Sequence, residues 1–214
     1  MKKRFLKDLI KEHFRVAIFG SARIKRNDVA YKQIYKLGWV LGKRNIDIVT
    51  GGGPGLMEAA NSGHKEGNKK TGAYSIGLNI KLLKEQMPNK HLDVKAEFAV
   101  FSERLDKFME LSNAVVVAHG GVGTLLELMY AWQLSQVEHI RSIPIILLGG
   151  MWEGFGEWLR REPMRRKYFE KNDIRLLFFT RKIEEVIEII DDAHESFKKG
   201  EKDFCIDYQK YGSP

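Results

Sequence analysis

The middle of the chain contains a glycine-rich turn between a short apolar run and a segment with helical periodicity. The run covers 114–118, and Thr124 and Glu127 follow the turn. A strand, a glycine turn and a helix in this order present backbone N–H groups and a helix N-terminus to an anion, most often a phosphate. The glycines allow a close approach because they carry no Cβ. The candidate binding residues of this turn are Gly120, Gly121, Val122, Gly123 and Thr124.

The same residues have a second interpretation. Thr124-x-x-Glu127 is also a capping box, in which both side chains bind the end of a helix that we expect over 125–136. The turn alone therefore leaves both ligand binding and helix capping open.

Two further glycine turns follow predicted strands, one after 15–19 and the other after 46–50. Ligands of open α/β sheets bind outside the carboxyl ends of the strands, so the three turns predict a nucleotide-sized phosphate ligand at one edge. The dinucleotide fingerprint is absent after the first strand, and so is the Walker A lysine pattern, which disfavours NAD binding and ATP hydrolysis. The candidates here are Gly20, Ser21, Gly52 and Gly53. Ser21 has the alternative of capping its own turn.

Strand-like and helical segments alternate along the chain. We expect strands at 15–19, 46–50, 73–78, 97–101, 114–118, 143–148 and 176–180, and helices at 28–41, 56–66, 103–111, 125–136, 152–159 and 183–197. Near-continuous apolar strands separated by helices predict a mostly parallel sheet. We therefore predict a single doubly wound, Rossmann-like α/β domain over 1–214, with about seven strands and helices on both faces. An N-terminal helix in 1–14 and a polar tail in 198–214 complete it.

Charge and composition disfavour several classes of protein. The net charge is +8, from 36 basic and 28 acidic residues. The basic residues are scattered and no aromatic-interleaved pattern accompanies them, so we expect no nucleic-acid partner. No apolar run approaches the roughly 18 residues of a membrane span, and no secretory signal is evident. With Cys205 as the single cysteine, we expect a cytoplasmic protein. The six histidines show no metal-ligand spacing, so no metal is expected.

Two motifs carry a resemblance to a known family. Gly51-Gly-Gly-Pro-Gly-Leu-Met57 and Gly120-Gly-Val-Gly-Thr-x-x-Glu127 resemble the LOG family, which comprises cytokinin-activating phosphoribohydrolases long described as lysine decarboxylases. The stretch from Ile76 to Asn89 is also similar to bacterial members. The resemblance implies hydrolysis of the N-glycosidic bond of a nucleoside 5′-monophosphate, either AMP or a cytokinin riboside monophosphate. It also implies a homodimer. We expect no cofactor, because no local pattern singles out the Schiff-base lysine that decarboxylation needs.

By position, the resemblance implies that Glu127 and Arg104 are catalytic and that 121–124 bind the phosphate. Cleavage of a ribosyl–base bond builds positive charge on the sugar. A carboxylate can offset that charge and orient or deprotonate the attacking water, while an arginine can hold the phosphate or orient Glu127. The alternative for Arg104 is a surface pair with Glu103 or Asp106. Two further candidate substrate contacts are Glu85 and Gln133.

Two positions depart from the family pattern. His119 stands where the family usually has proline before the paired glycines, and Leu105 stands where lysine often follows the arginine. These departures leave open a second function on the same fold, which is non-catalytic binding of a nucleotide or of molybdenum cofactor. The segment 125–134 is apolar nearly all round, so we expect it to be buried on every side, with a second subunit covering one of them.

Overall fold

The structure is a computed structural model that describes residues 13–81 and 87–201. The chain forms two compact units, Met1–Asn113 and Ala114–Pro214. The expected N-terminal helix lies almost entirely outside the described residues, as does most of the expected tail. Among the residues that are described, no helix is both long and apolar enough to cross a membrane.

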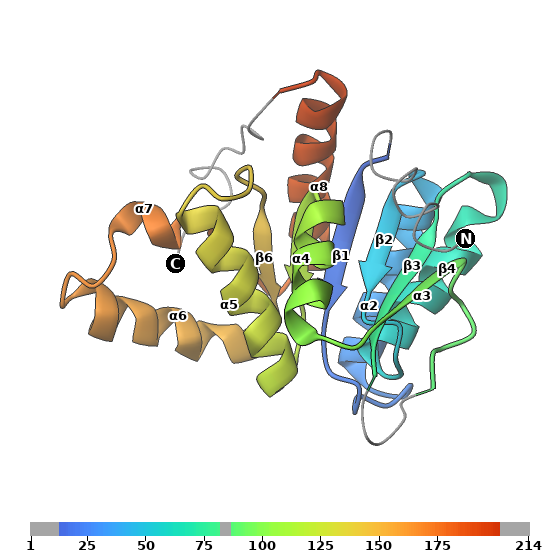
Figure 1. Cartoon of the computed structure of the whole chain (residues 1–214), viewed down its shortest axis with the longest axis horizontal. Coiled ribbons are helices and arrows are strands. Elements are labelled where there is room, and N and C mark those ends of the chain that lie inside the picture. The colour runs from blue at the N-terminus through green and yellow to red at the C-terminus, as the bar shows by residue number, and fades with distance from the viewer. Residues whose placement is uncertain (1–12, 82–86, 202–214) are drawn as a thin grey trace. The chain divides into compact units, whose positions relative to one another are not determined.

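The N-terminal unit alternates strands with helices. Its strands are β1 (Arg15–Phe19), β2 (Asp47–Thr50), β3 (Ser75–Ile80) and β4 (Val94–Phe98). They pair in parallel in the order β4-β3-β2-β1. Its helices are α2 (Val29–Lys43), α3 (Leu56–Gly67), the short 3-10 helix η1 (Asn68–Lys70) and α4 (Phe101–Leu111). Figure 1 draws α4 in front of these strands and α2 and α3 behind them, so helices cover both faces.

The C-terminal unit continues the alternation. Its strands are β5 (Ala114–Val117), β6 (Ile145–Leu148) and β7 (Leu177–Thr180), and both neighbouring pairs are parallel. Its helices are α5 (Val122–Gln136), η2 (Gly150–Trp152), α6 (Glu153–Leu159), the π-helical η3 (Arg160–Met164), α7 (Lys171–Ile174) and α8 (Ile183–Lys198). Helix α5 packs on β5 and β6, and α8 packs on all three strands.

The seven strands follow the order β4-β3-β2-β1-β5-β6-β7. All of the strand pairs described above are parallel, and helices separate most strands along the chain. The predicted doubly wound α/β fold with a parallel sheet of about seven strands is therefore confirmed.

One predicted strand lies at the wrong residues. We expected it at 97–101, but β4 is Val94–Phe98, which pairs with 76–80 of β3, and Phe101 already belongs to α4. The apolar run at 97–101 therefore spans the end of an edge strand and the start of a helix. The short elements η1, η2, η3 and α7 were not predicted.

One predicted helix start is also wrong. Helix α5 begins at Val122, with Gly121 as its N-cap and no side-chain cap bond, so Thr124 and Glu127 do not form a capping box. Helix α3, by contrast, begins at Leu56 as predicted, with Gly55 as its N-cap.

Helices α2 and α3 approach each other very closely because glycines line both. A Cβ on Gly38 would lie 2.3 Å from the carbonyl oxygen of Ala60, and a Cβ on Gly63 would lie 2.0 Å from that of Tyr35. The glycines in contact are Gly38, Gly42, Gly63 and Gly67. Because α3 begins directly after the turn at 51–55, this crossing fixes one end of that turn.

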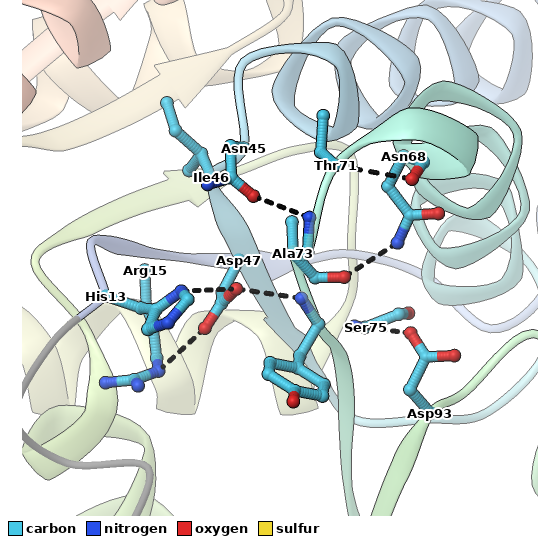
Figure 2. A network of polar contacts seen from close by, with 12 residues as sticks. His13, Arg15, Asn45, Ile46, Asp47, Asn68, Thr71, Ala73, Ser75 and Asp93 are labelled. Carbon is cyan, nitrogen blue, oxygen red and sulfur yellow. Dashed lines mark hydrogen bonds and ion pairs between the residues drawn. The ribbon is translucent and has the colours of Figure 1, made fainter.

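Buried Asp47 joins three strands at their amino ends (Figure 2). Its Oδ1 accepts a hydrogen bond from Tyr74 N at 2.8 Å, and its Oδ2 lies 3.2 Å from Arg15 Nε. Burial raises the pKa of Asp47, and the Tyr74 N–H and the charge of Arg15 oppose that rise. Since Arg15 opens β1, Asp47 opens β2 and Tyr74 precedes β3, these polar groups stabilise the end of the sheet that lies away from the glycine turns.

We predict that Gly38→Ala lowers the free energy of unfolding by about 1–3 kcal/mol, because the new methyl group meets a backbone carbonyl that cannot move alone. Gly154→Ala is the matched control. Gly154 lies inside α6, and a Cβ there would meet nothing within 4 Å. This control should gain about 0.5–1 kcal/mol from the better helix propensity of alanine. Urea denaturation of both variants measures the difference, and equal stabilisation by both would contradict the close crossing.

Candidate functional site

Two of the predicted glycine turns meet in the N-terminal unit. Gly20 and Ser21 follow β1, the 51–55 turn follows β2, and these strands are parallel neighbours. Leu56 N donates to the carbonyl oxygen of Ser21 at 2.9 Å, and a Cβ on Gly20 would lie 2.8 Å from Leu56 Cδ1. The Ser21 hydroxyl accepts a hydrogen bond from Arg23 N at 3.1 Å, so it serves its own turn. Phosphate binding by Ser21 stays a prediction.

Buried Asn89 holds the turn that follows β2. Its backbone N donates to the Gly52 carbonyl oxygen at 2.8 Å, and its Nδ2 lies 3.1 Å and 3.0 Å from the carbonyl oxygens of Gly52 and Gly53. Gly52 itself has φ +71° and donates its N–H to Thr50 Oγ1 at 3.0 Å. The Gly52 N–H is therefore bound within the protein. Because the peptide is planar and trans, the Gly53 N–H points away from the Gly52 carbonyl and from Asn89.

Asn61 completes this network. Its Oδ1 accepts hydrogen bonds from Thr50 Oγ1 and Asn89 Nδ2, each at 2.9 Å, and its Nδ2 donates to Ser75 Oγ at 2.8 Å. All four side chains are buried, where a missing partner would be costly. The sequence analysis did not identify Asn61 or Asn89 as site residues. The available signal was an asparagine in an otherwise apolar helical face and another directly after proline.

Arg104 lies beside the same turn. It belongs to the first turn of α4, and 9% of its surface is exposed. Its Nε donates to the carbonyl oxygen of Leu78 on β3 at 2.7 Å. A Cβ on Gly51 would lie 2.6 Å from Arg104 Nη2, so the guanidinium stands next to the glycine backbone. The structure thus places Arg104 at the carboxyl ends of β2 and β3.

The sequence left open that Arg104 lies on the surface of α4 and pairs there with Glu103 or Asp106. Glu103 and Asp106 are exposed, whereas Arg104 is buried, so Arg104 is not a surface residue of this helix. Leu105, where the family often has lysine, is a core residue that is 5% exposed.

In the C-terminal unit, the predicted turn opens the 15-residue helix α5. Gly121 and Gly123 are exposed, and a Cβ on either would meet nothing within 4 Å. Val122 between them is 84% exposed. Gly120, by contrast, packs on Thr124, whose Oγ1 would lie 2.1 Å from an added Cβ. The first turn of α5 therefore exposes backbone at a helix N-terminus, which is the geometry that binds anions.

Glu127 lies on the buried face of α5. It is 9% exposed, and Thr124 one turn earlier is 4% exposed. The other buried residues of this helix are Leu128, Ala131 and Ser135. Glutamate is rarely this buried, because removing a carboxylate from water costs free energy. Glu127 is therefore a candidate functional group rather than an ordinary surface residue.

Of the two remaining predicted contacts, only Gln133 is among the described residues. Gln133 is exposed on α5, where its Nε2 donates to Gln136 Oε1 at 3.1 Å. A spacing of six residues from Glu127 places Gln133 on a different face of the helix. Glu85 lies outside the described residues.

His119 is a packing residue in the C-terminal unit. Gly149, directly after β6, has φ +121°, and a Cβ there would lie 2.3 Å from His119 Cε1. The imidazole thus occupies the space that a side chain at 149 would need. Within the described part of the chain, no group of three His, Cys, Asp or Glu side chains is placed to hold a metal ion.

Solved structures share this fold. The molybdenum cofactor binding protein from Rippkaea orientalis is similar with a TM-score of 0.63 and 20% identity, over 85% of this chain and 97% of that one. The molybdenum cofactor carrier protein from Chlamydomonas reinhardtii is similar with a TM-score of 0.62 and 18% identity, over 86% of this chain and 99% of that one. At such low identity the likeness shows the fold alone.

Sequence comparison goes further. The "Pyrimidine/purine nucleotide 5'-monophosphate nucleosidase" of Escherichia coli strain K12 is 28% identical over 140 residues, which are 63% of this chain. This chain spans about 30% of the length of that relative. The family model described as "Possible lysine decarboxylase" matches residues 57–190. Because that match covers more than half of the chain, the protein belongs to the possible lysine decarboxylase family, which is the LOG family.

Proposed function

We propose that this protein hydrolyses the N-glycosidic bond of a nucleoside 5′-monophosphate to a free base and ribose 5-phosphate. The observation that carries the proposal is the combination, on α5, of an exposed glycine-rich N-terminus with the buried carboxylate of Glu127. The N-terminus suits a phosphate, and the carboxylate suits the reacting sugar. Family membership and the nucleosidase relative in Escherichia coli support the same reaction.

In the proposed mechanism, Glu127 acts on the sugar and on the attacking water. The water oxygen adds to the anomeric carbon while the electron pair of the glycosidic bond goes to the base nitrogen, which takes up a proton. The transition state has oxocarbenium character, and a negative carboxylate offsets its charge. Glu127 also receives the proton that the water loses and returns it to solvent, from which the base nitrogen is protonated, so the carboxylate is restored. Burial makes this electrostatic effect stronger than it would be in water.

In the N-terminal unit, Arg104 and the turn after β2 are proposed to bind an anionic group such as phosphate. The bond from Arg104 Nε to the Leu78 carbonyl fixes the guanidinium beside Gly51. Arginine keeps its charge at every physiological pH and bonds phosphate oxygens through a planar fork of donors. The Gly53 N–H, which points away from Asn89, is a second donor for the same purpose.

The proposed substrates are adenine nucleotides, either AMP or a cytokinin riboside monophosphate, and the proposed compartment is the cytoplasm. Both proposals rest on the family resemblance and on the single cysteine. Decarboxylation of lysine has less support from the residues. A Schiff-base lysine needs a lowered pKa, which burial provides, and no lysine is among the buried residues of the described part of the chain.

We predict that Glu127→Gln lowers the turnover of AMP by roughly 10²- to 10⁴-fold, because the amide neither offsets positive charge nor accepts the proton of water. Since α5 has no capping box at this residue, the variant should still fold and bind AMP. Release of free adenine measures the turnover, and Glu195→Gln, on the exposed side of α8, is the control. Wild-type cleavage by a Glu127→Gln protein that melts normally and binds AMP would remove Glu127 from the mechanism. AMP binding without any adenine release by the wild type would instead support the carrier function.

Recognition of the 5′-phosphate gives a second prediction. Because charge-assisted hydrogen bonds are the strongest contacts in this proposal, AMP should bind at least about 100-fold more tightly than adenosine. Ribose 5-phosphate, which keeps the phosphate and lacks the base, should also bind better than adenosine. Isothermal titration calorimetry compares the three ligands, and equal affinities for AMP and adenosine would show that the glycine turns do not bind phosphate.

We also propose that the protein is a homodimer that uses α5. Beyond its buried face, this helix carries exposed apolar side chains, which are Val122, Leu125, Leu126 and Met129. Part of its surface is already covered within the unit, because Trp132 Nε1 donates to the Asp173 carbonyl oxygen at 2.8 Å. The remaining apolar side chains are proposed to contact a second copy.

We expect the wild type to sediment as a dimer at micromolar concentration and Leu126→Lys to sediment as a monomer, because a buried lysine charge disfavours the interface. Val29→Lys is the control, since Val29 is an exposed apolar residue of α2 in the other unit. A monomeric wild type, or a dimer that both substitutions disrupt equally, would contradict the use of α5.

A further inference from the structure

Asn79 lies at the carboxyl end of β3, directly beside the turn that follows β2. Thr50, the last residue of β2, pairs with Gly77 of β3 in the parallel register. Gly52, in the turn after β2, and Asn79, on β3, are each two residues further along the chain. The contact is close, because a Cβ on Gly52 would lie 2.6 Å from Asn79 Oδ1. The carbonyl oxygen of the preceding residue, Leu78, accepts a hydrogen bond from Arg104 Nε at 2.7 Å. Asn79 therefore lies beside the turn and close to Arg104, both of which the proposed function uses.

The side-chain oxygen of Asn79 is buried without a hydrogen-bond partner among the described residues. The whole residue is 9% exposed. Native proteins satisfy most buried polar side-chain atoms, so each exception calls for an explanation. The buried amides nearby show the usual arrangement, since Asn61 Oδ1 accepts two hydrogen bonds and Asn89 Oδ1 accepts one from His91 N at 3.1 Å.

The unpartnered atom is an acceptor, which limits what it can bind. A nucleotide phosphate at neutral pH offers acceptors, and the donors of Arg104 and of the backbone suit it. Asn79 Oδ1 needs an N–H or O–H group instead. In a nucleoside monophosphate, those groups are the ribose hydroxyls and the exocyclic amine of the base. The site thus contains donors for the anionic end of a nucleotide and an unused acceptor for its other end.

We infer that Asn79 is a substrate-binding residue whose Oδ1 accepts a hydrogen bond from a hydroxyl or amino group of the bound nucleotide. This inference rests on the proposed function and adds to it a residue that selects for the nucleoside part. In the absence of substrate, the buried oxygen is a cost to the folded protein, and substrate removes that cost.

The test compares the same substitution at two buried asparagines. Leucine has nearly the shape of asparagine and no polar atoms, so Asn79→Leu should melt at or above the wild-type temperature, because replacing an unsatisfied acceptor removes its cost. Asn89→Leu leaves the carbonyls of Gly52 and Gly53 without their donor and should melt about 4 °C lower or more. Asn79→Ala serves as a second variant if leucine does not fit. A drop in melting temperature for both Asn79 variants as large as that of Asn89→Leu would show a structural role and overturn the inference.

Calorimetry with AMP then measures binding, in the Glu127→Gln background, where turnover is expected to be slow. Asn79→Leu should weaken AMP binding by roughly 5- to 10-fold, the effect of one neutral hydrogen bond. Unchanged AMP affinity would overturn the inference. If the background protein and the wild type both fail to bind AMP, the proposed function fails as well, so the two failures are distinguishable.

Analogues of AMP identify the group that Asn79 contacts. The probes are 2′-deoxy-AMP, 3′-deoxy-AMP and purine riboside 5′-monophosphate, which lack the 2′-hydroxyl, the 3′-hydroxyl and the 6-amino group. For the analogue that lacks the contacted group, Asn79→Leu should cause no further loss, because the two changes remove the same bond. A full loss with every analogue would show that none of these donors meets Asn79, and it would overturn the inference.

Discussion

The hydrogen bonds from Asn89 to the carbonyl oxygens of Gly52 and Gly53 are the contacts on which the N-terminal part of the candidate site depends. A planar peptide turns as a unit, so fixing a carbonyl also fixes the N–H on its other side. Asn61 Oδ1 accepts a hydrogen bond from Asn89 Nδ2, and Thr50 Oγ1 accepts one from the Gly52 N–H. Thr50 in turn donates to Asn61. A glycine turn would otherwise sample many conformations. Because the network is buried and bonded before any ligand arrives, binding need not order this backbone, and less affinity is lost to entropy.

The fold could be predicted from the sequence because parallel strands covered by helices are apolar along their whole length, as at 15–19 and 114–117. The prediction failed at β4 for the same reason. This edge strand has only one buried residue, Val94, so its apolar pattern is weak. The stronger apolar run at 97–101 therefore predicts the strand at the wrong residues. Pairing with β3 decides its true position. The sequence predicts the start of α5 too late, because threonine is a preferred N-cap residue and Thr124 therefore marks a helix start more strongly than Val122 does.

The candidate site was predictable only where local motifs carry it. Arg104 and Glu127 came from the family resemblance, and the structure places both at buried positions within their own units. The polar network was not predictable, because Asn61 and Asn89 are 28 residues apart and meet only once α3 and the chain after β3 are in place. The contact of Asn79 with Gly52 depends in the same way on the register of β2 and β3. Each of these contacts depends on a single asparagine, so it leaves no periodic pattern in the sequence.

Both residues that depart from the family pattern pack against neighbours within their own units. Leu105 is in the core, so a lysine there would have to bring its charge to the surface past buried side chains. Arg104, one residue earlier, keeps its bond to the Leu78 carbonyl. His119 replaces a compact proline with a ring, and the ring has room because Gly149 lacks a Cβ and has φ +121°. A side chain at 149 would meet that ring, so His119 and Gly149 depend on each other. The chain therefore accommodates both departures within each unit while Arg104 and Glu127 remain in place.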